Sequence, residues 1–501
     1  MTKLVIRSVL KNILFKYGLL AIFLCLMLIY LLQAQNLSDK SKVPKKRYSG
    51  KTWTSVIVGK VSDVFGNKLQ RNIDNYDPYP DNGIIIKNLV NGYPFEESTE
   101  IIVEPRGKIY VAGTSYIDSQ KSSSIPFIAK LNSNGSLDKT FGSNGIIKIP
   151  NLPNNIKVES TVSLINHKRQ FYVGFYGSIP KGEYESENVS VIMKIDPNGK
   201  IQESFGDKGF VIIRNSILQD IIIDKKQSMY VGCSEFTIDA NLNLFSTGLL
   251  YKLNLNGNKD TSFGSSGKIV ISDLLPNKRN NMLIDISLGR NNCVYASVYV
   301  LPDVQTLTGD YMLILKATPK GLDKTFGQKG IFTLSKVGNY SRCSPTIIHV
   351  GIGEKLYVGG QAEKGQDQDI MVFKLNSYGQ LDKTFGNNGI SVIDIFDKQS
   401  EYKEQCSSIT LDKRGNIYLF GNFFPSDQQQ KSDCFAIRLL PTGKIDTSFS
   451  KRGVLVISNI GSASNRQDTL FSSYTDLLGR IFITGYTYNE YDSDIFVLKI
   501  D

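Results

Sequence analysis

Histidine, the side chain that most often carries acid–base or metal chemistry near neutral pH, is almost absent from this chain of 501 residues. His167 and His349 are too few for a three-histidine zinc site, and each falls near an expected strand, where a lone histidine usually packs or faces solvent. No Gly-x-Ser-x-Gly sequence is present, so the nucleophile elbow of the serine hydrolases is missing. These residue types indicate no catalytic group.

Cysteine gives no metal site either. Cys25 falls in an apolar N-terminal run, and the other five cysteines are an odd number with no Cys-x-x-Cys pair and no regular spacing. A disulfide between Cys343 and Cys406 stays open, because chains outside the cytoplasm permit one. We expect no metal, no cofactor and no catalytic cysteine.

Carboxylates are abundant, at 47 Asp and Glu, but no pair stands out for glycosidic cleavage. Asp367 and Asp369, like Asp492 and Asp494, are two-oxygen fragments that lack the glycine and glutamate of an EF-hand loop. We interpret them as solvated loop residues rather than as a calcium site.

The net charge of +11 does not indicate a nucleic-acid partner, because its location is uneven. Residues 1–50 contain nine Lys and Arg against the single Asp39, which leaves only +3 for the other 451 residues. Basic residues beside an apolar run are typical of contact with anionic lipid heads. We therefore expect the chain to contact a membrane and not to bind nucleic acid.

The N-terminus divides into three segments. Residues 1–16 form a basic, cytoplasmic start, residues 17–35 a transmembrane anchor or signal-peptide core, and residues 36–75 a polar, Lys-rich linker. Residues 18–32 carry no charge, which is long for a signal core and short for a full span. Ala34 offers a cleavage point, so the anchored and the secreted forms both stay open. In either case the remainder lies outside the cytoplasm.

One tract recurs along the rest of the chain. It reads Leu-Asn-x-x-Gly-x-Leu-Asp-x-Thr-Phe-Gly-x-x-Gly-Ile at 131–146 and again at 375–390. Its closing glycine recurs every 58 to 64 residues, at Gly83, Gly145, Gly209, Gly267, Gly330, Gly389 and Gly453. A fixed period indicates one supersecondary unit that is stacked many times.

Each unit contains four expected strands, near 98–104, 108–113, 126–131 and 145–149 in the first copy. They are short runs rich in Val, Ile, Tyr and Phe, bounded by Gly, Asn, Asp and Pro. A four-stranded unit of about 62 residues has the size of a large propeller blade. The sequence predicts an all-β protein, a β-propeller spanning residues 76–501.

The two ends of this region predict how the ring closes. The chain stops just after a third strand at 494–500, and an unused fourth strand lies at 83–87, before the first complete unit. If the N-terminal strand completes the last blade, the chain makes seven four-stranded antiparallel blades with no broken unit.

The repeated polar residues have a structural interpretation. The aspartate of the tract can accept backbone N–H groups, the phenylalanine can fill the seam between blades, and the glycine supplies a positive φ. Because these residues repeat around the ring, they do not mark a site. They are Asp138, Phe141, Gly145, Phe205, Gly209, Asp260, Phe263, Gly267, Asp323, Phe326, Gly330, Asp382, Phe385, Gly389, Asp446, Phe449 and Gly453.

The tract resembles the delta-60 repeat family, uncharacterised β-propeller repeats of bacterial proteins, over about residues 76–501. Gln202 in place of the aspartate and Ser450 in place of a glycine depart from that pattern. The resemblance implies propeller architecture and carries no known activity.

The links between the second and third strands differ in every unit, whereas the other hairpin links are near-copies. Together with the links that lead to the next unit, these variable links form one face of a propeller, and loops on a rigid scaffold are where function diverges. They include residues 175–188, 422–432 and 486–493. The expected contact residues for a protein or glycan partner are Tyr176, Tyr184, Phe236, Phe423, Phe424, Tyr488 and Tyr491.

We therefore predict a membrane-tethered binding scaffold. A hydrolase or lyase in the central channel and a purely structural envelope component are the alternatives. A close pair of carboxylates near the channel axis would favour the enzyme.

Overall fold

The structure, a computed structural model, describes residues 84–86, 89, 93–104, 107–121, 123–149, 152–168, 170–182, 185–238, 244–302, 309–365, 367–396, 402–425, 432–450, 452–458, 460, 467–476, 479–488 and 492–500. Strands and short 3-10 turns make up the regular structure of these residues, so the chain is an all-β protein, as predicted. Across the same ranges no helix is long and apolar enough to cross a membrane. The segments expected at 1–16, 17–35 and 36–75 lie outside the described residues.

Consecutive strands pair in antiparallel groups, and each group is called a blade here. The first complete blade contains β2 (Phe95–Val103), β3 (Ile109–Tyr116), β4 (Ser124–Leu131) and β5 (Ile146–Lys148). The next contains β6 (Lys157–His167), β7 (Gln170–Pro180), β8 (Ser186–Ile195) and β9 (Phe210–Arg214). A third contains β10 (Ser216–Ile223), β11 (Ser228–Ile238), β12 (Leu244–Asn254) and β13 (Lys268–Val270).

The pattern continues towards the C-terminus. The following blade contains β14 (Asn281–Leu288), β15 (Val294–Val300), β16 (Tyr311–Thr318), the two-residue β17 (Gly321–Leu322) and β18 (Ile331–Leu334). It is followed by the blade of β19 (Arg342–Val350), β20 (Leu356–Lys364), β21 (Asp367–Leu375) and β22 (Ile390–Ile393). The next contains β23 (Tyr402–Leu411), β24 (Ile417–Pro425), β25 (Asp433–Leu439) and β26 (Val454–Ile457).

The C-terminal strands β27 (Gln467–Thr475), β28 (Ile481–Tyr488) and β29 (Ser493–Ile500) are joined by β1 (Ile84–Ile86). The pairs are Ile84 with Val497, Ile85 with Phe496 and Ile86 with Ile495. The pairing predicted between the front of this region and its last strand is therefore confirmed. It supplies β29 with a neighbour on its outer edge.

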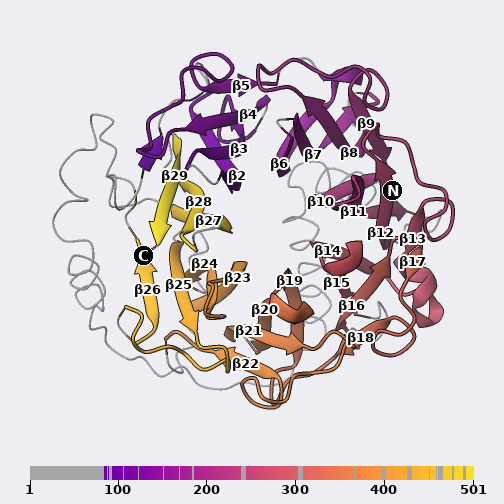
Figure 1. Cartoon of the computed structure of the whole chain (residues 1–501), viewed down its shortest axis with the longest axis vertical. Helices are drawn as coiled ribbons and strands as arrows, with labels where there is room; N and C mark the ends of the chain where they lie inside the picture. Colours follow the sequence, from indigo (N-terminus) through magenta and orange to yellow (C-terminus); the bar gives the residue numbers. More distant parts are fainter. Residues whose placement is uncertain are drawn as a thin grey trace, which may run out of the picture.

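The blades are arranged in a ring, with the first strand of each blade nearest the centre and the short fourth strand at the rim (Figure 1). Short 3-10 turns occur in the links, at Pro153–Asn155, Ile271–Leu274, Pro276–Lys278, Arg290–Asn292 and Ile352–Glu354. A ring of antiparallel blades is the architecture of a β-propeller.

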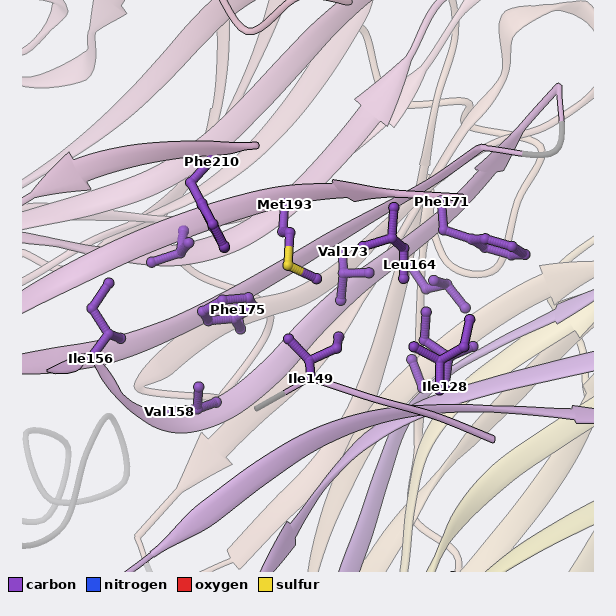
Figure 2. Close-up of a cluster of buried hydrophobic side chains, with 14 of the residues drawn as sticks. Ile128, Ile149, Ile156, Val158, Leu164, Phe171, Val173, Phe175, Met193 and Phe210 are labelled. Carbon is purple, nitrogen blue, oxygen red and sulfur yellow. The ribbon is translucent and has the colours of Figure 1, made fainter. Parts of the chain in front are cut away.

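Buried apolar side chains fill the space between neighbouring blades. Figure 2 shows one such cluster, in which Ile128 and Ile149 from the β2–β5 blade lie with Phe171, Phe175 and Met193 from the β6–β9 blade. Each fully buried side chain of this size contributes roughly 1.5–3 kcal/mol. Because a blade is covered on both faces, a middle strand such as β3 is buried along its whole length instead of at alternate residues.

The repeated tract makes the same contacts in one blade after another. The tyrosine of the second strand meets the tract phenylalanine with ring centroids 5.6–6.2 Å apart, and all six phenylalanines are at most 6% exposed. The basic residue of the third strand lies over that tyrosine. The pairs are Tyr110–Phe141, Tyr172–Phe205, Tyr230–Phe263, Tyr295–Phe326, Tyr357–Phe385 and Tyr418–Phe449.

The tract aspartate connects this aromatic contact to the turn. Asp260 accepts the backbone N–H of Ser262 at 3.1 Å and pairs with Lys252 at 2.7 Å, and Asp138, Asp323, Asp382 and Asp446 repeat both contacts. The closing glycine is required by the backbone: Gly209 has a φ of +97°, and a Cβ there would lie 2.1 Å from Ile201 Cγ2. The aspartate of the tract thus makes hydrogen bonds and ion pairs within the fold, and the glycine adopts a positive φ, which agrees with a structural role for both.

Candidate functional site

One face of the ring carries the hairpins between the second and third strands and the links that lead to the next blade; it is called the variable face. Tyr176 on β7, Phe236 on β11, Phe424 on β24 and Tyr488 on β28 lie towards this face and are half-buried. Tyr184 and Tyr491 lie outside the described residues. The structure therefore brings four of the expected contact residues to the expected face, on different blades.

Phe423 is a correction. It is 3% exposed, and its ring lies 4.9 Å from Phe396 and 6.0 Å from Tyr402, so it belongs to the core. The loop was expected at 422–432, but β24 continues to Pro425, and Phe423 pairs with Glu404 on the inner strand β23. Four further residues of pairing, 422–425, place Phe423 inside the blade, where a partner cannot reach it.

Tyr176 lies within a cluster of charged and aromatic groups at the seam between the β2–β5 and β6–β9 blades. Lys121 pairs with Glu97 at 2.9 Å and lies 4.6 Å above the Tyr116 ring. The Tyr116 hydroxyl donates to the backbone oxygen of Glu159 at 2.6 Å, which joins the two blades. These residues, Glu97, Tyr116, Lys121, Glu159 and Tyr176, are called the Tyr176 cluster.

Electrostatics in the Tyr176 cluster follow from burial. Burial raises the pKa of Tyr176, and the carboxylates of Glu159 and Glu97 raise it further, so the phenol stays protonated and can donate a hydrogen bond. Burial also raises the pKa of Glu159, although Lys157 opposes it. The cluster offers an ammonium, a phenol and two carboxyl groups, the groups that recognise polar protein surfaces and glycans.

A second group of chemistry-bearing residues lies on the inner strands. Glu100 on β2, Asp220 on β10 and Asp285 on β14 each follow a shift in strand register, a β-bulge in the middle of the strand. A bulge turns a side chain out of the regular alternation, and such bulges are common next to active sites. All three side chains are half-buried.

Hydrogen bonds fix these three carboxyl groups. Glu100 Oε1 accepts from Ser472 Oγ at 3.0 Å, Asp220 Oδ1 from the Ile221 N–H at 2.7 Å, and Asp285 Oδ2 from the Ile348 N–H at 2.8 Å. Two of these bonds reach another blade. The carboxyl groups are therefore held in place at the seams.

Burial raises the pKa of Glu100 and of Asp285 to about 7, and it raises the pKa of Asp220, with repulsion from Asp285 and Glu100 adding to the effect. Carboxyl groups poised near neutral pH can give or take a proton. Residue types and spacing alone do not predict this group. A signal is present in the sequence, since each acid directly precedes an isoleucine in an inner strand.

Metal and thiol chemistry find no support in the part of the chain that the structure describes. No group of three or more His, Cys, Asp or Glu there is placed to hold a metal ion. Cys343 and Cys406 are buried free thiols in different inter-blade cores, so the disulfide left open by the sequence is absent. Burial lowers the pKa of His349 to about 4, which keeps it neutral.

Comparison with protein families gives one match. A family model described as "Domain of unknown function (DUF5122) beta-propeller" matches residues 105–141, which include the first copy of the repeated tract up to Phe141. This supports a β-propeller repeat family. No curated protein matches the chain.

Several solved structures resemble the chain weakly. The polysaccharide lyase Uly1 is 11% identical, covering 80% of this chain and 89% of its own, with a TM-score of 0.44. The phage phi92 endosialidase is 8% identical over 84% of this chain and 69% of its own, at 0.40. A protein of unknown function from Dyadobacter fermentans DSM 18053 is 10% identical over 84% of this chain and 98% of its own, at 0.38. Similarity at this level assigns no activity.

Proposed function

We propose that this chain is a seven-bladed β-propeller of the delta-60 repeat type that is tethered outside the cytoplasm and binds a protein or glycan partner through its variable face. Each blade is built on four strands, with the two-residue β17 as an additional pairing in one of them, and β1 completes the blade of β27–β29. The N-terminal apolar segment, residues 17–35, provides the membrane attachment unless it is cleaved.

One observation carries the binding function. The opposite face repeats one tyrosine–phenylalanine–lysine–aspartate network, whereas the variable face gathers a unique set of groups in the Tyr176 cluster. A ring of equivalent units can recognise an asymmetric partner only where the units differ. Rigid blades with divergent links provide that arrangement.

The test compares matched variants on the two faces. We expect Lys121→Ala combined with Phe424→Ala and Tyr488→Ala to reduce binding on a glycan array and cross-linked capture from membrane extracts at least about tenfold, as for contact residues in a binding surface. Tyr378→Ala combined with Ile352→Ala is the control, because these side chains are 71% and 74% exposed on the opposite face. Equal binding by both variants would refute the proposal.

An enzyme is the second candidate, and the inner-strand carboxyl groups favour it. Glu100 and Asp285, with pKa values of about 7, would serve as general acid and general base for glycosidic cleavage or elimination. Incubation with a panel of anionic polysaccharides should then release fragments, and Asp285→Asn should stop the release. Intact polysaccharides after incubation with folded protein would exclude this candidate.

A further inference from the structure

Four carboxyl groups converge on the variable face at the seam between the β19–β22 and β23–β26 blades. Asp367 and Asp369 belong to β21, Asp394 follows β22, and Glu404 belongs to β23. Asp394 is exposed, whereas Asp369 is 4% and Glu404 2% exposed, so the group runs from the surface into the seam. These four residues are called the acidic seam.

The backbone holds the acidic seam together. Gln368 pairs with Lys403 across the two blades, and Gln368 Nε2 donates to the backbone oxygen of Glu404 at 3.0 Å. The N–H of Ile395 donates to Glu404 Oε1 at 2.9 Å, which brings the link carrying Asp394 against Glu404. The next residue, Phe396, stacks on Tyr402 at 4.5 Å, so aromatic rings secure this link.

The buried carboxyl group of Glu404 has an incomplete set of hydrogen bonds. Its second oxygen, Oε2, is buried and has no hydrogen-bond partner among the described residues. Burial raises the pKa of Glu404 to about 9, and the carboxylates of Asp369, Asp394 and Asp367 add to that rise. Buried carboxyl oxygens are normally satisfied, so an arriving donor with a positive charge would relieve both conditions.

The preceding seam shows which donor suits this location. There Arg342, on the first strand of its blade, lies 3.4 Å from Asp310 of the blade before it and 3.6 Å from Glu363. The chain's own guanidinium thus lies among the carboxylates of that seam. Lys403 takes the corresponding place on β23, where it acts on Glu363. Tyr340 donates its hydroxyl hydrogen to Asp369, and Lys364 acts on the same carboxylate.

We propose that the acidic seam binds the ammonium or guanidinium group of a lysine or arginine side chain on a partner polypeptide. The proposal deepens the proposed function and rests on it, since it assigns a ligand chemistry to the variable face. Such a group donates several N–H bonds and can span carboxylates that are spread too widely for a metal ion. In the described residues no three acidic groups are placed to hold an ion.

The test is titration of full-length protein with fluorescein-labelled hexalysine and hexaarginine peptides, followed by fluorescence anisotropy at low ionic strength. Asp367→Asn combined with Asp394→Asn should weaken peptide binding about tenfold, because it removes two charges from the mouth of the site. Glu404→Gln should weaken it as well, since the amide replaces the oxygen that lacks a donor. Thermal melts establish that each variant is folded.

The control is Glu203→Gln combined with Asp207→Asn, which removes two exposed carboxylates from the opposite face. It should leave peptide affinity within about twofold of the original, because these carboxylates lie on the opposite face and do not contact a peptide bound at the acidic seam. Equal losses in the seam and control variants would overturn the proposal. The proposal would also be overturned if the protein bound spermidine but neither peptide, or if it bound calcium and the seam variant abolished that binding.

The outcomes separate this inference from the proposed function. If peptides fail to bind while the Lys121, Phe424 and Tyr488 variant still loses partner capture, the acidic seam is not the ligand site but the variable face is. If neither the peptides nor the partner binds at the variable face, both the inference and the proposed function are refuted.

Discussion

At the scale of single residues, the carboxyl group occurs here in two opposite environments. Hydrogen bonds from Lys252 and Ser262 hold the pKa of Asp260 below its usual range, and the equivalent aspartates of the tract behave in the same way. Among the described residues, neutral donors hold Glu100 and Asp285, namely the Ser472 hydroxyl and the Ile348 N–H, and burial raises their pKa values to about 7. The first set stabilises turns, and the second is available for proton transfer.

The raised pKa values predict how stability depends on pH. As the pH rises from 6.5 to 8, the folded protein releases protons from Glu100 and Asp285 that the unfolded chain has already released at pH 6.5, so the free energy of unfolding falls. We expect a loss of roughly 1 kcal/mol per group over this interval. Urea denaturation at several pH values measures it.

Two features sharpen this measurement. His349, with its pKa lowered to about 4, contributes stability that is present above pH 6.5 and lost on acidification, so it leaves the chosen interval undisturbed. The Glu100→Gln and Asp285→Asn double variant should show a flatter dependence than the original protein. Identical slopes for both proteins would contradict the assignment.

At the scale of elements, the inner strands share one irregularity. Each of β2, β6, β10, β14, β19, β23 and β27 shifts register against its neighbour, and β6 does so twice. The residues that follow the shift point towards the seams between blades, as Ser472 does towards Glu100. Repetition of the bulge therefore positions side chains that the repeated tract does not include.

The short strand β1 provides a direct test of the closure. We expect a chain that begins at residue 93 to lose roughly 2–5 kcal/mol of unfolding free energy relative to one that begins at residue 83, because three residue pairs of β29 lose their partner. The unpaired edge of β29 should also promote association. Chemical denaturation and light scattering measure the two effects. Equal stability and equal size of the two chains would show that β1 does not close the ring.

At the scale of the whole molecule, the two faces of the ring differ in what they can recognise. The hairpins of the repeated tract give one face the same contacts from blade to blade, whereas the Tyr176 cluster and the acidic seam lie at different seams of the variable face. A partner that contacts both places would meet aromatic rings at one and negative charge at the other. Because the Tyr176 cluster and the acidic seam lie at different seams, a ligand that contacts both must be large.

Attachment to a membrane is a prediction at this scale. Flotation of the full chain with lipid vesicles that contain anionic lipid should bring the protein to the top of a density gradient, because residues 17–35 are apolar and basic residues flank them. A chain that begins at residue 36 should stay at the bottom. Recovery of both chains in the same fraction would exclude the anchor.

The sequence by itself determined the repeating all-β architecture and the pairing of residues 84–86 with the last strand, because both follow from periodicity and from turn residues that act locally. It also predicts Tyr176, Phe424 and Tyr488 as contact residues of one face, since links that differ between units are visible in a single chain. It was wrong about Phe423, because the length of a strand depends on its neighbours, and β23 offers four more pairing positions than the turn residues indicate.

The tertiary structure alone decided which carboxyl groups lie together. Glu100, Asp220 and Asp285 are 65 to 185 residues apart in the sequence, and Asp369 meets Glu404 only because two blades pack at that seam. Burial and mutual repulsion then change the chemistry of these acids, and neither exists until the ring has formed. The sequence shows that these acids lie in strands, but which groups become their neighbours is a property of the closed ring.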